Sequence, residues 1–138
     1  AAAVAGAFYD AGFRAGTIIA RNEAAGTALA RRYGYAWAPE PGDLTAPVIV
    51  NVTPIGMSGG AESEQLAYPQ PTIEAASVVF DVVAMPVETP LIRAARAAGR
   101  EVITGGEVIA LQAAEQFRLY TGVTLSPDDI AQAEAQAN

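Results

Sequence analysis

The sequence predicts an α/β fold in which a doubly wound, mostly parallel sheet is flanked by helices. Short apolar segments rich in β-branched residues alternate along the chain with longer segments of helical period, and glycine-rich or proline-rich turns separate them. One such strand is predicted at the start of Pro47–Met57, where four residues without a polar side chain come before Asn51. A continuous apolar segment of this kind is typical of a parallel strand covered on both faces.

The first part of the chain predicts two helices and one strand. In order, these are a helix over Ala1–Ala11, a short buried strand over Thr17–Ala20, a helix over Glu23–Tyr33 and a connector over Trp37–Thr45. Gly12 and Gly34 follow the two helical segments, where glycine commonly ends a helix. Because the chain begins on a helix, a dinucleotide-binding fold built from it would lack its first strand and the glycine-rich turn after that strand.

The second part of the chain predicts three strands and three helices. In order, these are a strand over Pro47–Val50, a surface loop or lid over Ser58–Pro71 with one helical turn around Glu62–Leu66, a strand over Ser77–Val83, a helix over Pro90–Ala98, a strand over Glu101–Thr104, a turn at Gly105 and Gly106, a helix over Glu107–Tyr120, and a last helix from Ser126 to the end. Thr89 and Ser126 each stand before a proline, a pair typical of an N-cap and the first helical position.

Length and composition indicate one globular domain. The chain has 138 residues, of which 51% are hydrophobic, enough for a real core. No apolar segment approaches the roughly 20 residues that span a bilayer, and the alanine-rich start lacks the basic flank of a signal peptide, so we expect a cytoplasmic protein. The net charge of −7 gives no electrostatic reason to bind nucleic acid or an anionic membrane, and we expect neither partner.

The residue types that are absent restrict the chemistry further. The chain has no cysteine and no histidine, and all eight of its basic residues are arginines, so it has no lysine. Disulfides, Cys/His zinc sites and Ser–His or Cys–His nucleophiles are therefore excluded within this sequence. Histidine and lysine are the usual tunable acids and bases. Any proton transfer would have to use carboxylates, tyrosine, a ligand or another polypeptide.

Polar residues follow the predicted strands, where open α/β sheets bind their ligands. Asn51 and Thr53 either contact a ligand there or only satisfy backbone groups, while Gly56 supplies a turn. Arg21 stands where an arginine favours the 2′-phosphate of NADP, or it is an ordinary exposed arginine near a helix start. We expect Asp81 to accept hydrogen bonds from a loop or a helix N-terminus. Gln112 could donate to and accept from a polyhydroxylated ligand, or lie on a helix surface.

Three motifs, in this order and spacing, resemble the shikimate dehydrogenase family. They are Asn51–Met57, Asp81–Pro86 with Thr89–Leu91, and Gly105 through Gln112 to Tyr120–Gly122. Ala20, Arg21 and Asn22 look like the family's Asn-Arg-Thr segment, so the resemblance extends over essentially the whole chain. The Ala84-Met85-Pro86 segment looks most like the shikimate dehydrogenase-like branch.

The resemblance implies an oxidoreductase that transfers hydride between NADP(H) and shikimate or a related cyclic hydroxy acid, on a Rossmann-type sheet. It assigns Arg21 and Asn22 to the adenosine 2′-phosphate, Thr53 to the cofactor near the strand end, Val82 and Gly105 to the nicotinamide, and Gln112 to substrate hydroxyls. In the family, a lysine and an aspartate of an amino-terminal substrate domain handle the proton. Neither matches a residue here, so the resemblance assigns no catalytic residue to this chain.

The resemblance also implies that residues 1–138 are the carboxyl-terminal part of an NADP-binding domain. A missing amino-terminal region, or a second chain as in a homodimer, would then complete the unpaired strand edges. Ala25 replaces the family's second basic residue, so NADP preference rests on Arg21, while Ala84 and Val108 replace a tyrosine and a methionine near the substrate and nicotinamide. The alternative interpretation is a non-catalytic, truncated Rossmann-like module for nucleotide binding or assembly.

Overall fold

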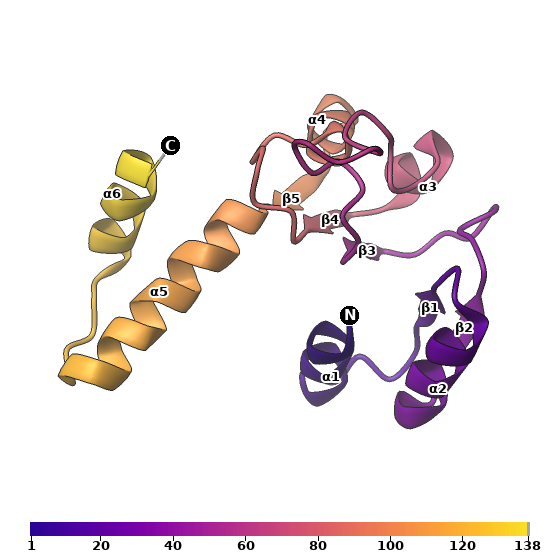
Figure 1. Cartoon of the computed structure of the whole chain (residues 1–138), viewed down its shortest axis with the longest axis horizontal. Coiled ribbons are helices and arrows are strands. Elements are labelled where there is room, and N and C mark those ends of the chain that lie inside the picture. Colours follow the sequence, from indigo (N-terminus) through magenta and orange to yellow (C-terminus); the bar gives the residue numbers. More distant parts are fainter. Residues whose placement is uncertain (138) are drawn as a thin grey trace. The chain divides into compact units, whose positions relative to one another are not determined.

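The computed structural model describes residues 1–137, and it has the predicted α/β architecture (Figure 1). The chain divides into two compact units, Ala1–Thr45 and Ala46–Asn138, each with its own parallel sheet. The strand order is β1-β2 in the first unit and β3-β4-β5 in the second. In the part of the chain that the structure describes, no helix has the length and apolar content needed to cross a membrane.

The first unit consists of two helices and two strands. They are α1 (Ala2–Asp10), β1 (Thr17–Ile19), α2 (Glu23–Tyr33) and β2 (Ala36–Ala38), and β1 pairs in parallel with β2. The expected helix ends are confirmed, because Gly12 and Gly34 have φ angles of 98° and 71°. Asn22 begins α2, where its Oδ1 accepts a hydrogen bond from Ala25 N at 3.0 Å.

The strand β2 was not predicted from the sequence, and it overlaps the first two residues of the segment Trp37–Thr45 that was predicted to be a connector. A tertiary contact explains the strand: Trp37 packs against α2 at Gly26, where an added Cβ would lie 2.3 Å from the indole nitrogen. The indole N–H also donates to Ala20 O at 3.2 Å. The expected burial of Thr17–Ala20 was wrong too, because Thr17 is exposed and Ile18, Ile19 and Ala20 are only half-buried.

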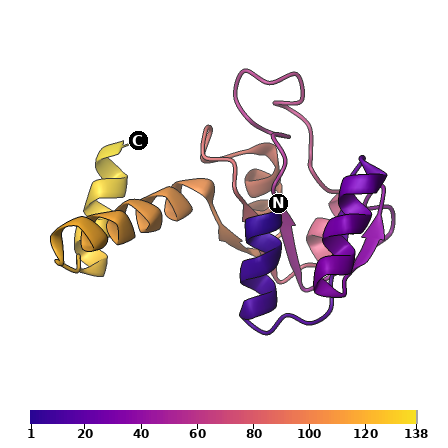
Figure 2. The same ribbon diagram turned by 60° about the horizontal axis from the view of Figure 1, so that its bottom comes forward.

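The second unit consists of three parallel strands and four helices within the described residues. They are β3 (Val48–Asn51), α3 (Gln70–Ala75), β4 (Val78–Asp81), α4 (Pro90–Ala97), β5 (Glu101–Ile103), α5 (Gly105–Thr121) and α6 (Pro127–Ala137). The helices α5 and α6 pack against each other (Figures 1 and 2). Ser126 caps α6 as expected, because its hydroxyl accepts from Asp129 N at 3.2 Å.

The core of the second unit lies where β3 and β4 meet α3 and α4. The side chains of Ile73, Val79 and Ile92 are fully buried, and Leu91 is 1% exposed. Burying such side chains contributes about 1.5–3 kcal/mol each. This core fixes the strands whose carboxyl ends form the candidate site.

Two local predictions for this unit were wrong. The sequence predicted a loop through Pro71, but α3 begins at Gln70, and burial of Thr72 and Ile73 stabilises this short helix. Between Glu62 and Leu66 the chain forms hydrogen-bonded turns rather than a helix.

Gly105 and Gly106, predicted to be a turn, are instead the first residues of α5. The helix starts earlier because Thr104 and Glu107 form a reciprocal capping box: Thr104 N donates to Glu107 Oε2 at 2.6 Å, and Glu107 N donates to Thr104 Oγ1 at 3.3 Å.

Candidate functional site

The carboxyl ends of β3 and β4 lie side by side and carry polar residues. Asn51 is paired with Asp81 at the end of the parallel register, and Val82 N donates to Asn51 O at 3.1 Å. Asn51 is 2% exposed and Asp81 is 0% exposed. Two buried polar side chains at this edge of a parallel sheet mark the position where such folds bind ligands.

Asn51 organises the loop that leaves β3. Its Nδ2 donates to Asp81 Oδ1 at 3.0 Å and to Ile55 O at 3.2 Å. Its Oδ1 accepts from Thr53 N at 3.0 Å and from Thr53 Oγ1 at 2.6 Å. One buried amide therefore holds both the start and the middle of the loop, and it leaves Thr53 exposed.

Asp81 joins this loop to the start of α4. Besides Asn51, its carboxylate accepts from Val83 N at 3.0 Å and from Thr89 Oγ1 at 2.7 Å. The expectation that Asp81 accepts from a loop or a helix start is confirmed. Burial raises the pKa of Asp81 above its usual value, and the bonds from Thr89, Val83 and Asn51 oppose that rise.

Thr89 was expected only as the N-cap of α4, and this role is confirmed because Ile92 N donates to its hydroxyl at 3.2 Å. Its second role as a donor to Asp81 was missed. The only signal in the sequence was a threonine downstream of a buried acid.

Two glycines allow the surrounding segments to approach closely. Gly56 has a φ angle of +87°, and an added Cβ would lie 3.3 Å from Thr89 and Pro90. At Gly105 an added Cβ would lie 2.4 Å from Val83 O and 2.7 Å from Val82 O. The N-terminus of α5 therefore sits directly on the chain leaving β4, a contact that only glycine permits.

The predicted site residues of the second unit lie at its strand exits and on α5. Thr53 is tied to Asn51, Val82 is bonded to the same residue through the backbone, and Gly105 packs on Val82. Gln112 is exposed about two helical turns further along α5.

Arg21 and Asn22 belong to the first unit and are described there by themselves. Both are exposed and directly follow β1. Asn22 Oδ1 already accepts the capping bond from Ala25 N, so its side chain offers a ligand the amide N–H₂ rather than the oxygen. The role of Asn22 as a helix cap was not predicted from the sequence, and it leaves the amide nitrogen available for a contact.

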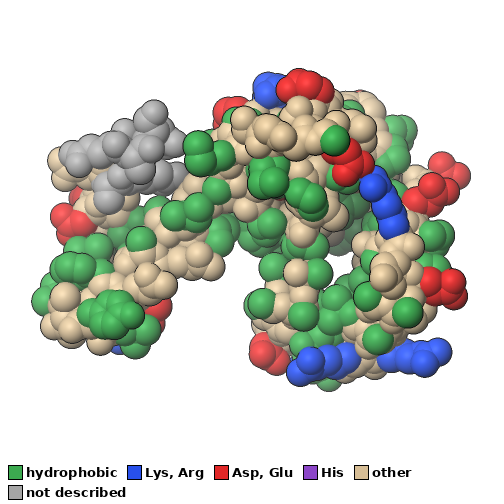
Figure 3. Space-filling view, in the orientation of Figure 1, with side chains coloured by type: hydrophobic (Ala, Val, Ile, Leu, Met, Phe, Trp, Pro, Cys, Tyr) green, Lys and Arg blue, Asp and Glu red, His purple; other side chains and the backbone are tan. Residues whose placement is uncertain are grey.

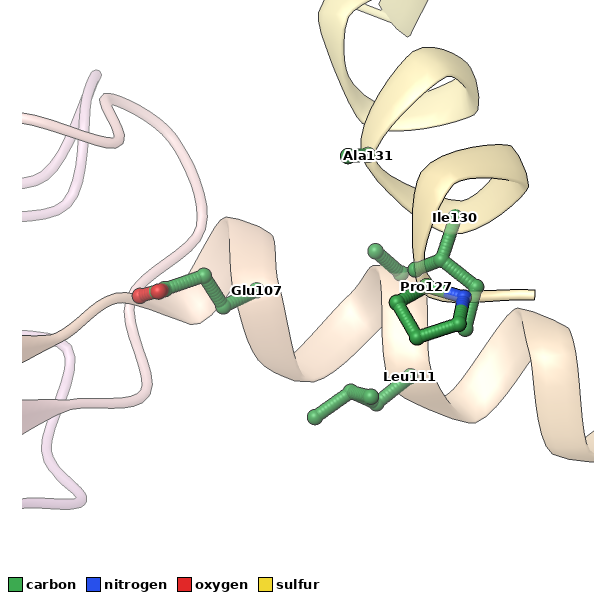
Figure 4. A pocket seen from close by; sticks show the side chains of 6 residues that line it. Glu107, Leu111, Pro127, Ile130 and Ala131 are labelled. Atoms are coloured by element: carbon green, nitrogen blue, oxygen red, sulfur yellow. The ribbon is translucent and has the colours of Figure 1, made fainter.

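The structure also contains a shallow apolar hollow between α5 and α6 (Figure 4). Its lining residues are Glu107, Ala110, Leu111, Pro127, Ile130 and Ala131. The polar member, Glu107, is engaged in the capping box, so the hollow offers no convergent polar groups of the kind that bind a cofactor. Within the described residues, no group of three His, Cys, Asp or Glu side chains could hold a metal ion.

Comparison with known proteins decides the family. The chain is 52% identical over 137 residues to a shikimate dehydrogenase-like protein of Haemophilus influenzae, an alignment that covers 99% of this chain and 51% of that one. A solved shikimate 5-dehydrogenase-like structure matches with a TM-score of 0.92 and 52% identity, over 96% of this chain and 49% of that one. The chain belongs to the shikimate dehydrogenase family.

Other members of the shikimate dehydrogenase family support the same fold. The shikimate 5-dehydrogenase of Thermus thermophilus, solved with NADP(H) and shikimate, matches with a TM-score of 0.82 and 30% identity, over 99% of this chain and 51% of that one. No family model matches the sequence. The chain spans about half the length of its Haemophilus relative.

Proposed function

We propose that this chain is the NADP(H)-binding portion of an oxidoreductase that transfers hydride between NADP(H) and shikimate, or a related cyclic hydroxy acid. The carrying observation is the contact of Gly105 with the chain leaving β4, where an added Cβ would lie 2.4 Å from Val83 O. This contact leaves backbone without a side chain at the carboxyl end of β4, the edge where open α/β sheets bind ligands, and we propose that the nicotinamide ring packs on this backbone cradle. The Thermus relative, solved with NADP(H) and shikimate, supports this choice of ligands.

Each of the two units carries residues that suit one part of this cofactor. Arg21 would pair with the 2′-phosphate, with the Asn22 amide as a second donor, because a guanidinium binds phosphate through two parallel hydrogen bonds. Thr53, Val82 and Gly105 would hold the nicotinamide end. The bound cofactor supplies the hydride, and we propose that Gln112 donates to and accepts from the substrate hydroxyls.

The proton step requires groups outside this chain. The sequence has no histidine and no lysine, and its one buried carboxylate among the described residues, Asp81, is bonded to three donors. We therefore propose that a further amino-terminal region supplies the acid–base residues, and that this region or a second copy of the chain completes the strand edges.

A binding and turnover assay of the 138-residue chain tests this division of roles. We expect NADPH to bind, as measured by its fluorescence, and we expect no oxidation of shikimate with NADP. Turnover by the purified chain would contradict the argument about the proton, and absence of NADPH binding by a folded chain would contradict the cofactor assignment.

The absence of histidine and lysine also favours a second candidate function, a non-catalytic nucleotide-binding or assembly module. An activity and binding assay of the protein encoded by the longest reading frame that contains this chain distinguishes the two functions. If that protein oxidises shikimate or a related hydroxy acid with NADP, the enzyme is supported. If it binds NADPH but turns over no such acid, the module is supported.

A further inference from the structure

Asp81 is a buried carboxylate to which the proposed function assigns no role. Its side chain is 0% exposed, and its hydrogen-bond donors are all neutral: Asn51 Nδ2, Val83 N and Thr89 Oγ1. Removing a carboxylate from water is costly unless hydrogen bonds compensate. The buried carboxylate lies at the edge of the sheet that faces the candidate site, and there it holds neighbouring polar groups in place.

The first group that Asp81 holds is the Asn51 amide, and the orientation of this amide is unambiguous. One end of the amide meets Asp81 Oδ1 and Ile55 O, which can only accept, so that end is Nδ2. The other end meets Thr53 N, which can only donate, so that end is Oδ1. A flipped amide would place like groups against each other at all three contacts.

The Asn51 oxygen in turn fixes the direction of the Thr53 hydroxyl. Thr53 Oγ1 lies 2.6 Å from Asn51 Oδ1, which has no proton to give, so the hydroxyl donates its single proton inward. Thr53 Oγ1 also accepts from Ile55 N at 3.3 Å. The remaining lone pair of this exposed residue is what it can offer to a ligand.

We infer that Asp81 is a positioning residue: through Asn51 it holds the Thr53 hydroxyl with its proton directed inward, so that Thr53 binds a hydrogen-bond donor of the ligand rather than a phosphate oxygen. The identity of the ligand rests on the proposed function. In the nicotinamide half of NADP(H), where the proposed function places Thr53, the donors are the ribose hydroxyls and the carboxamide N–H₂, whereas the phosphates accept. The inference therefore assigns Thr53 to the sugar or carboxamide of the nicotinamide half.

The link between Asp81 and Asn51 is tested without any ligand. In the folded protein we expect the side-chain amide protons of Asn51 to exchange slowly with water, as measured by NMR, and to exchange at least about tenfold faster in Asp81→Asn. The matched control is Thr89→Val, which removes another donor to Asp81 but leaves the bond to Asn51 in place, so exchange should stay near the wild-type rate. Equal exchange in wild type and Asp81→Asn would overturn the inference.

The direction of the Thr53 hydroxyl is tested with two probes, and this test does not depend on the folding of Asp81→Asn. In the longest protein that contains this chain, we expect Thr53→Val to weaken NADPH binding about three- to tenfold. Adenosine 2′,5′-bisphosphate, which lacks the nicotinamide half, should bind to Thr53→Val with an affinity within about twofold of that for wild type. Thr53→Ser should restore NADPH binding.

Equal losses for the two probes, or no loss for NADPH, would overturn the assignment of Thr53. If the wild-type protein binds neither probe, the proposed function fails and the ligand assignment fails with it. The exchange of the Asn51 amide still decides the link to Asp81 in that case, so the two failures are distinguishable.

Discussion

The two compact units have the same local architecture, parallel strands with helices, but different interactions hold the carboxyl ends of their strands. In the second unit Asn51, Asp81 and Thr89 are at most 2% exposed and bonded to one another in a chain. In the first unit neither β1 nor β2 has a buried residue, and the exit of β1 is held by the Asn22 cap and by the bond from the Trp37 indole N–H to Ala20 O. The second exit is thus shaped by a buried core, whereas the first is held by a helix cap and a side-chain bond nearer the surface.

The largest expected effect comes from removing core volume in the second unit. Leu91 is 1% exposed, and Leu91→Ala should lower the free energy of unfolding by about 2–5 kcal/mol in urea denaturation. The matched control is Leu119→Ala, because Leu119 is 68% exposed and its loss should change stability by about 0.5 kcal/mol or less. Equal effects of the two variants would show that the core does not stabilise this unit.

The next-largest effect is expected from adding a Cβ at two closely packed glycines, one of which lies against backbone and the other against a side chain. Gly105→Ala places a Cβ against Val83 O, while Gly26→Ala places one against the Trp37 indole. Both should lower stability in urea denaturation, by about 1–3 kcal/mol for overpacking. Trp37→Leu should recover part of the stability lost in Gly26→Ala, because it replaces the side chain that the new Cβ meets. No substitution can relieve the contact of Gly105→Ala in the same way, because that Cβ meets the backbone carbonyl of Val83. A tolerated Gly105→Ala would remove the steric argument for the nicotinamide cradle.

A smaller effect is the pH dependence that Asp81 gives the second unit. Burial raises its pKa above 3.8, so between 3.8 and the raised value the folded state binds more protons than the unfolded state. The contribution to stability is therefore present at the acid end of this window and is lost as the pH rises through the raised pKa. Urea denaturation across this window should show that slope in wild type and not in Asp81→Asn.

The control for the pH series is Asp129→Asn at the start of α6. Bonds from Ser126 lower the pKa of this exposed carboxylate, so its contribution has the opposite sign and is lost as the pH falls through the lowered value. A pH series in which Asp81→Asn keeps the wild-type slope would contradict the role of burial at Asp81.

The sequence was a good guide to whatever depends on neighbours along the chain. The caps at Thr89 and Ser126 follow from short-range bonds, and both are confirmed. The elements that were missed depend on distant contacts: β2 on Trp37 packing at Gly26, and α3 on the burial of its own apolar face.

The same distinction between local and distant contacts applies to the candidate site. The strand exits at Thr53 and Val82 could be placed from the apolar segments before them, because a strand that ends in polar residues is a local pattern. The bond between Asn51 and Asp81 could not, because it depends on the register of β3 against β4. The contact of Gly105 with Val83 likewise depends on the fold, whereas the early start of α5 was a missed local signal, because the capping box joins Thr104 to Glu107.

The most direct test of the central claim, that this chain binds NADP(H), is the effect of Arg21→Ala on the two nicotinamide cofactors. In the longest protein that contains this chain, titration calorimetry should show NADP binding weakened by about 1.5–3 kcal/mol and NAD binding nearly unchanged, because only NADP carries the 2′-phosphate. Arg14→Ala is the matched control, since Arg14 lies over the Tyr9 ring in the same unit at 4.0 Å and should leave the ratio of the two affinities unchanged. Equal losses for NADP and NAD in Arg21→Ala would contradict the account and show that Arg21 is structural.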